Sequence, residues 1–111
     1  MNMATQPDNW VPVIEEALLK EEVPTAVFPK GLPLLLIKKS DREIYALSGR
    51  CPHMGCPLRR GALDGYILRC PCHDWRFDIR TGVFVDAKEI SLVVYEVKAE
   101  NGSIMVNVLE G

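Results

Sequence analysis

Every cysteine and histidine of the chain lies in one of two short segments. Residues 51–56 have the sequence CPHMGC and residues 70–73 have the sequence CPCH, with residues 57–69 between them. Thiolates and imidazoles are the ligands that zinc sites and iron–sulfur clusters prefer. This concentration of ligands indicates a metal or redox role. The alternative, structural cysteines beside two incidental histidines, does not account for their gathering in two segments.

Each segment pairs one cysteine with one histidine at close spacing: Cys51 with His53, and Cys70 with His73. Structural zinc sites usually pair cysteine with cysteine and histidine with histidine at short intervals. A mixed pair in each segment is more easily reconciled with a two-iron site, in which the two cysteines hold one iron and the two histidines hold the other. A structural zinc module is the alternative interpretation.

Short β-strands must position these two segments. Aliphatic and β-branched runs over residues 23–28, 34–39 and 44–47 are separated by turn residues, which predicts an antiparallel meander before the first segment. Further strands are expected over residues 66–69, 75–77, 83–85, 90–97 and 104–108, and Asn101-Gly102 predicts a hairpin between the last two. Helical periodicity predicts one short helix over residues 14–22.

The composition predicts one globular domain over residues 1–111. The chain is 48% hydrophobic and 25% charged, with a net charge of -2, which excludes a nucleic-acid-binding role. Residues 1–10 contain no apolar signal sequence. The longest apolar run, residues 32–37, is too short to span a membrane. We therefore expect a cytoplasmic protein with no membrane anchor.

The arrangement Cys51-x-His53, sixteen residues, then Cys70-x-x-His73 resembles the Rieske motif. Residues 63–65, 75–78 and 81–82 also resemble segments that flank this motif in Rieske domains. The resemblance implies an all-β fold, a Rieske-type antiparallel β-sandwich with an inserted cluster-binding subdomain at about residues 47–85. It also implies one 2Fe-2S cluster with Cys51, His53, Cys70 and His73 as ligands.

The resemblance also has implications for four further residues. In the quinol-oxidising branch of the family, cysteines at the positions of Cys56 and Cys72 form a disulfide between the ligand loops, so we expect that bridge here. The high-potential branch places a serine and a tyrosine, which donate hydrogen bonds to the cluster sulfurs, where this chain has Trp75 and Phe77. Since neither side chain has a hydroxyl, we expect a lower reduction potential and no quinol-oxidising role.

The function implied by the resemblance is that of a one-electron carrier with no catalytic site of its own. Its partners would be a protein electron donor, such as a flavin reductase, and a protein acceptor, an oxygenase or another reductase. An alternative is the small Rieske-like subunit of a nitrite-reductase-like complex. The chain itself is not expected to be an oxygenase, because its two histidines are already assigned and a mononuclear iron site would need two more.

Arginines are concentrated around the two cysteine–histidine segments. Residues 50–80 carry a net charge of +3, whereas the rest of the chain carries -5. The arginines of this stretch are Arg50, Arg59, Arg60, Arg69, Arg76 and Arg80, and its acids are Asp64, Asp74 and Asp78. A basic surface of this kind can dock an acidic partner. Local pairing with the aspartates is the alternative.

Overall fold

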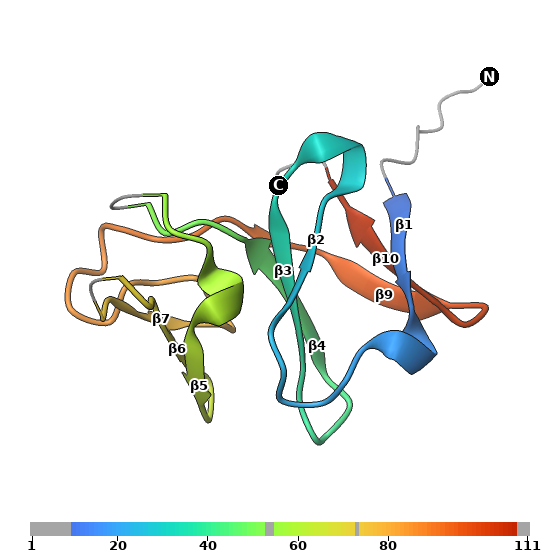
Figure 1. The fold of residues 1–111 in the computed structure, drawn as a ribbon, viewed down its shortest axis with the longest axis horizontal. Coiled ribbons are helices and arrows are strands. Elements are labelled where there is room, and N and C mark those ends of the chain that lie inside the picture. Colours follow the sequence, from blue (N-terminus) through green and yellow to red (C-terminus); the bar gives the residue numbers. More distant parts are fainter. Residues whose placement is uncertain (1–9, 53–54, 73, 109–111) are drawn as a thin grey trace.

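The described residues form three small antiparallel sheets arranged side by side (Figure 1). A computed structural model describes residues 10–52, 55–72 and 74–108. The first sheet has the order β1-β10-β9, the second β2-β3-β4-β8 and the third β5-β6-β7. The third sheet lies between β4 and β8 in the sequence, although β4 and β8 are neighbours in one sheet. It therefore belongs to an insertion into the second sheet.

The strands are two to six residues long. The first sheet contains β1 (Trp10–Glu15), β9 (Val97–Glu100) and β10 (Ser103–Asn107). The second contains β2 (Thr25–Val27), β3 (Leu34–Lys38), β4 (Ile44–Ser48) and β8 (Val94–Tyr95). The third contains β5 (Ala62–Asp64), β6 (Ile67–Arg69) and β7 (Arg76–Asp78). Three 3-10 turns, η1 (Glu16–Leu18), η2 (Pro29–Gly31) and η3 (Leu58–Arg60), complete the described part.

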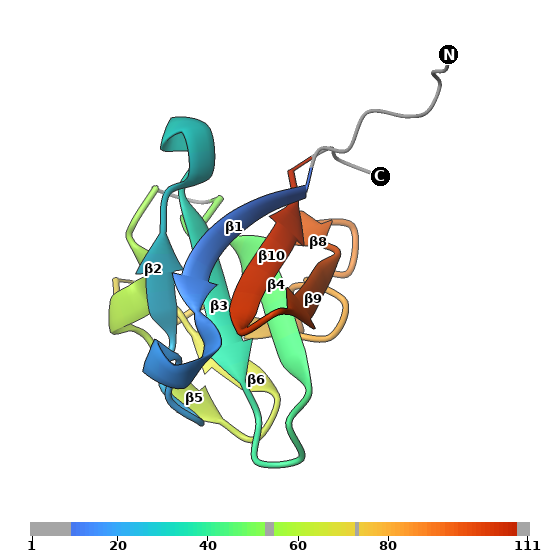
Figure 2. The same cartoon turned by 90° about the vertical axis from the view of Figure 1, so that its right-hand side faces the viewer.

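Strand β3 is buried on both faces, which explains its uninterrupted apolar sequence. Leu34 and Leu36 pack into a core shared with the first sheet, which Figure 2 shows in front of β3. Leu35 and Ile37 point the other way, into a core shared with the inserted segment. Because successive side chains of a strand alternate between its faces, one strand holds the two halves of the molecule together.

Lys39, which follows β3, adds a polar link between the two halves. Its side chain is almost completely buried. The ammonium group donates to Glu22 Oε1 at 2.7 Å and to the carbonyl oxygen of Gly65, in the β5–β6 turn, at 2.5 Å. It also lies 4.9 Å from the centre of the Tyr66 ring. The inserted segment is thus anchored by a charge as well as by apolar packing.

The expected antiparallel β architecture is confirmed. The meander predicted over residues 23–47 corresponds to β2, β3 and β4, which pair in that order. The predicted hairpin joins β9 to β10, and both of its turn residues, Asn101 and Gly102, have the positive φ angles that such a turn requires. No helix in the described part of the chain is long and apolar enough to cross a bilayer.

Three predicted elements are wrong in type or extent. The helix expected over residues 14–22 is instead the end of β1 followed by the single turn η1, because Ile14 pairs with the distant Ile104. Val83 and Phe84 form only isolated bridges, and Val85 lies in a turn, so residues 83–85 are not a strand. The single strand expected over 90–97 is divided into β8 and the start of β9. Strands β1 and β5 were not predicted.

Candidate metal centre

Two loops carry the predicted ligand residues. The first follows β4 and contains Cys51, and the second joins β6 to β7 and contains Cys70. Both cysteines are buried, with 2% and 0% of their surface exposed, and neither is in a disulfide. They belong to the core that surrounds Leu58, Leu68 and Phe77. Two thiols, one from each loop, are therefore held in surroundings shielded from water.

The two loops have the same backbone hydrogen-bond pattern. In the first, the amide of Cys51 donates to the carbonyl of Cys56 (2.9 Å) and the amide of Gly55 donates to the carbonyl of Cys51 (2.7 Å). In the second, the amide of Cys70 donates to the carbonyl of Trp75 (2.7 Å) and the amide of Asp74 donates to the carbonyl of Cys70 (3.0 Å). Each cysteine thus begins a tight turn closed by the fourth and fifth residues after it.

A disulfide between Cys56 and Cys72 joins the loops, as the family resemblance implied. The Cα atoms of the pair are 6.5 Å apart. The sulfur of Cys70 belongs to the same group, because the three sulfur atoms lie within 4.8 Å of one another. Since disulfide sulfurs supply no thiolate, Cys56 and Cys72 are not metal ligands in this state. Cys51 and Cys70 are then the thiolate donors that remain.

This donor set fits a cluster that takes one thiolate from each loop. Cysteine thiolates are the ligands that iron–sulfur clusters prefer. The other two predicted ligands, His53 and His73, lie outside the described residues, and so does Met54. The disulfide joins the two loops that contain the predicted ligands. The assignment of all four ligands stays a prediction.

Aromatic residues pack beside the second loop. Trp75 stacks on Phe84, with ring centres 4.3 Å apart and an angle of 8° between the planes. Phe77 is fully buried beside this stacked pair, with its ring centre 6.4 Å from that of Trp75 and 5.5 Å from that of Phe84. Phe77 thus serves as core, and its side chain offers no hydroxyl to a neighbouring sulfur. The sequence did not predict a role for Phe84, because Phe84 lies outside the segments that carry the motif, whereas Trp75 and Phe77 lie within one of them.

Two arginines, one at the start of β7 and one just after its end, are paired with acids. Arg76 Nη2 lies 3.1 Å from Asp86 Oδ1. Arg80 donates to both carboxylate oxygens of Asp78, at 3.0 and 2.9 Å, and these bonds hold the pKa of Asp78 below its usual value. The local pairing considered for the arginines therefore applies to Arg76 and Arg80. Asp86, outside the basic stretch, was not predicted as a partner.

Comparison with known protein families identifies the kind of domain that contains these loops. Residues 9–103 match the model of the Rieske [2Fe-2S] domain. The chain belongs to the Rieske [2Fe-2S] domain family. The family is defined by a 2Fe-2S cluster, in agreement with the cofactor predicted from the motif.

Relatives of two kinds share this Rieske domain. The ferredoxin component of the naphthalene 1,2-dioxygenase system of Pseudomonas putida is 30% identical over 99 residues, which cover 88% of this chain and 94% of that protein. Apoptosis-inducing factor 3 of Homo sapiens is 38% identical over 77 residues, which cover 68% of this chain. The chain spans only 13% of the length of that second relative. The domain thus occurs both as a small protein and as part of a much longer one.

The fold agrees with a solved Rieske ferredoxin. The ferredoxin of carbazole 1,9a-dioxygenase from Nocardioides aromaticivorans IC177 superimposes with a TM-score of 0.78 at 30% identity. The superposition covers 87% of this chain and 95% of the ferredoxin. The all-β Rieske fold expected from the motif is therefore confirmed over most of the chain.

Proposed function

We propose that the chain is a one-electron carrier that takes an electron from a protein donor and delivers it to an oxygenase or another terminal enzyme. A flavin reductase is the proposed donor. The similarity to two ferredoxin components of dioxygenases, over nearly their whole length, supports this proposal. We further propose that the chain acts in the cytoplasm as a single domain over residues 1–111, with its cluster-binding subdomain at about residues 47–85.

The observation that carries the proposal is the matched pair of loops. Each loop holds one buried cysteine at the start of the same hydrogen-bonded turn, and a disulfide joins the two turns. We propose Cys51, His53, Cys70 and His73 as the ligands of one 2Fe-2S cluster. When bound, the cluster supplies a reversible one-electron couple.

The protein's own residues give that couple a fixed environment. The turns orient Cys51 and Cys70, and the surrounding apolar side chains exclude water from their sulfurs. A preorganised, dry site of this kind undergoes little rearrangement when its charge changes. The exposed edges of the loops, at Pro52 and Pro71, lie at the surface, where a partner protein can approach.

The residues at positions 75 and 77 support a potential in the lower part of the range for Rieske centres. The buried Phe77 and the half-buried Trp75 provide no hydroxyl donor. Rieske centres span about -150 to +300 mV, and we expect this one in the lower half. A redox titration of the purified protein measures the value directly. A reduction potential near the upper limit would mean that the lack of hydroxyl groups at positions 75 and 77 does not determine the potential.

Iron and sulfide analysis combined with EPR of the reduced protein tests the function. We expect two irons and two labile sulfides per chain and a reversible one-electron couple. The variants Cys51→Ser and Cys70→Ser should lose the cluster signal, whereas the double variant Cys56→Ala/Cys72→Ala should assemble it. Zinc without labile sulfide, or no reversible couple, would contradict the proposal. Stable co-purification with a large reductase would favour a subunit role over a mobile carrier.

A further inference from the structure

A surface groove runs along β2 beside the first cysteine loop. A hollow of about 150 Å³ is lined by Ala26, Phe28, Pro33, Leu34, Gly49, Arg50, Pro57 and Arg59. A second, more open hollow continues along the same strand and is lined by Pro24, Thr25, Ala26, Arg59 and Arg60. The two hollows share Ala26 and Arg59. Together they form one elongated depression, which we call the β2 groove.

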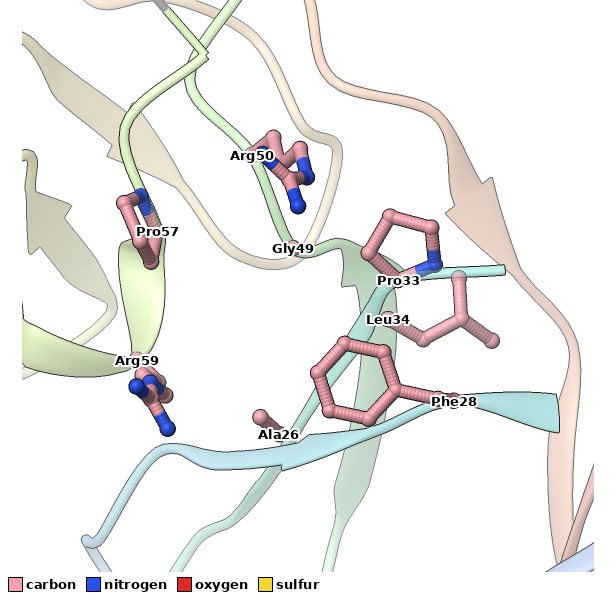
Figure 3. Close-up of a pocket in the computed structure, with 8 residues that line it drawn as sticks. All are labelled: Ala26, Phe28, Pro33, Leu34, Gly49, Arg50, Pro57 and Arg59. Atoms are coloured by element: carbon pink, nitrogen blue, oxygen red, sulfur yellow. The ribbon is translucent and has the colours of Figure 1, made fainter. Parts of the chain in front are cut away.

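The groove has an apolar floor and a cationic rim. Figure 3 shows the ring of Phe28 directed toward the space that Arg50, Pro57 and Arg59 enclose. The Phe28 side chain is 60% exposed, which is unusual for a large aromatic residue. Arg59 and Arg60 are also exposed. An exposed aromatic ring next to arginines is typical of surfaces that bind other proteins.

The positive charge of the rim is not neutralised within the described residues. No acidic residue from the described part of the chain lines either hollow. Arg50 donates to the carbonyl of Gly55 at 3.4 Å, and within residues 10–52, 55–72 and 74–108 the ion pairs formed by arginines involve Arg76 and Arg80. The groove therefore attracts anionic groups, in a protein whose charge outside residues 50–80 is negative.

The groove is built from the backbone that leads into the first cysteine loop. The amide of Gly49 donates to the carbonyl of Pro33 at 3.0 Å, and the amide of Leu58 donates to the carbonyl of Gly49 at 2.8 Å. A Cβ atom added at Gly49 would come within 3.2 Å of the Leu34 backbone, so the loop is packed tightly against β3. These backbone contacts hold the walls of the groove in place, and Arg50 on its rim is adjacent in sequence to Cys51.

We infer that the β2 groove docks a redox partner protein through a segment that presents an apolar side chain flanked by carboxylates. The apolar side chain packs on Phe28, and the carboxylates pair with Arg59 and Arg60. An extended segment fits better than a compact small molecule, because the two hollows share Ala26 and Arg59 and follow each other along β2. The inference rests on the proposed function only in naming the partner as a redox protein.

Binding of a labelled peptide to the cluster-loaded protein tests the groove. The probe has one phenylalanine with two glutamates on each side, and fluorescence anisotropy reports its affinity. We expect Arg59→Glu/Arg60→Glu to weaken binding about tenfold or more. Phe28→Ala should weaken binding roughly threefold to tenfold, because an apolar contact is lost. A peptide with serine in place of phenylalanine should lose the same factor on the native protein.

Matched controls distinguish binding in the groove from effects of net charge or of exposed apolar surface elsewhere on the protein. Arg42→Glu/Lys98→Glu makes the same change in net charge at exposed positions away from the groove. Leu18→Ala removes a side chain that is 62% exposed, close to the 60% of Phe28. Both controls should keep the native affinity within about twofold. Equal losses in the control and groove variants would overturn the inference, as would the absence of peptide binding by the native protein.

Two further measurements complete the test. Benzoate that binds as tightly as the peptide would identify a small-molecule site and overturn the docking inference. Redox titration of each variant should still give a reversible one-electron couple, since none of the substituted residues is a proposed ligand. If the protein carried no redox-active cluster but bound the peptide through Phe28, Arg59 and Arg60, the proposed function would fail and the groove would stand.

Discussion

Asp74 occupies in the second cysteine loop the position that Gly55 occupies in the first. Each residue lies four positions after the buried cysteine of its loop, and its amide donates to the carbonyl of that cysteine. Both have left-handed backbone angles, with φ of 71° at Gly55 and 60° at Asp74. The first loop uses the residue that tolerates this conformation best, whereas the second uses an aspartate, one of the few other residues that adopt it.

Substitutions at these two positions should therefore differ in their effect on stability. A Cβ atom at Gly55 would meet no atom within 4 Å, so Gly55→Ala tests backbone conformation alone. We expect it to lower the free energy of unfolding by about 1 kcal/mol. Asp74→Gly relieves the same strain but frees the unfolded chain, so its effect should be within about 0.5 kcal/mol of zero. Urea unfolding measures both values, and equal effects of the two substitutions would contradict the argument.

The disulfide between the loops should be important for stability as well as for geometry. Its two cysteines are separated by 16 positions, and closing a loop of that size stabilises a protein by about 3 kcal/mol in the chain-entropy model. Cys56→Ala/Cys72→Ala should lose a stabilisation of this order and should release iron faster on heating. The double variant is preferable to a single one, which would leave a thiol near Cys70. An unchanged rate of iron release would show that the turns hold the site without the bridge.

The sequence predicted the meander of β2, β3 and β4 well, because its signals are local. The run over β3 is apolar without interruption, and turn residues separate it from β2 and β4. The Asn101-Gly102 hairpin was predictable for the same reason. Strand β1 was missed because its pairing is distant: Ile14 lies opposite Ile104. It is also an edge strand that contains Pro12, and proline weakens a strand signal.

The two cysteine loops were predictable from the sequence, but their construction was not. The spacing of cysteines and histidines identified the two loops, because ligand type is a property of the sequence itself. The shared turn geometry of Cys51 and Cys70 depends on backbone conformation, which the sequence indicates only through Gly55. The Arg76–Asp86 pair and the Trp75–Phe84 stack join residues from separate segments, so no local sequence pattern predicted these contacts.

The buried Lys39 should determine how firmly the inserted segment is attached. Lys39→Met removes the charge-assisted bond to Gly65 and leaves that carbonyl without this donor, which should destabilise the fold by about 2 kcal/mol. Amide hydrogen exchange should accelerate first in β5 and β6, because the link ends in the turn between them. Lys38→Met, at the half-buried neighbouring position, is the matched control. A uniform acceleration over all three sheets would argue against a local anchoring role.

The Asp78–Arg80 pair should make stability depend on pH in the acid range. Arg80 donates two hydrogen bonds to the Asp78 carboxylate, and the backbone amide of Arg80 donates a third at 2.9 Å. These bonds lower the pKa of Asp78 below its ordinary value of 3.8. A carboxylate with a lowered pKa stabilises the folded state fully above its unfolded pKa, and this contribution is lost as the pH falls through the folded value.

Comparing the native protein with Asp78→Asn isolates that contribution. The native protein should have the higher unfolding midpoint temperature near pH 7, and the difference should shrink below about pH 4, where the unfolded carboxyl group takes up a proton. Arg80→Gln should reproduce the loss, because it removes the donor rather than the acceptor. Thermal unfolding between pH 3 and pH 7, followed by circular dichroism, measures the curves. A difference that stays constant over this range would mean that Asp78 stabilises β7 through its neutral hydrogen bonds and not through its charge.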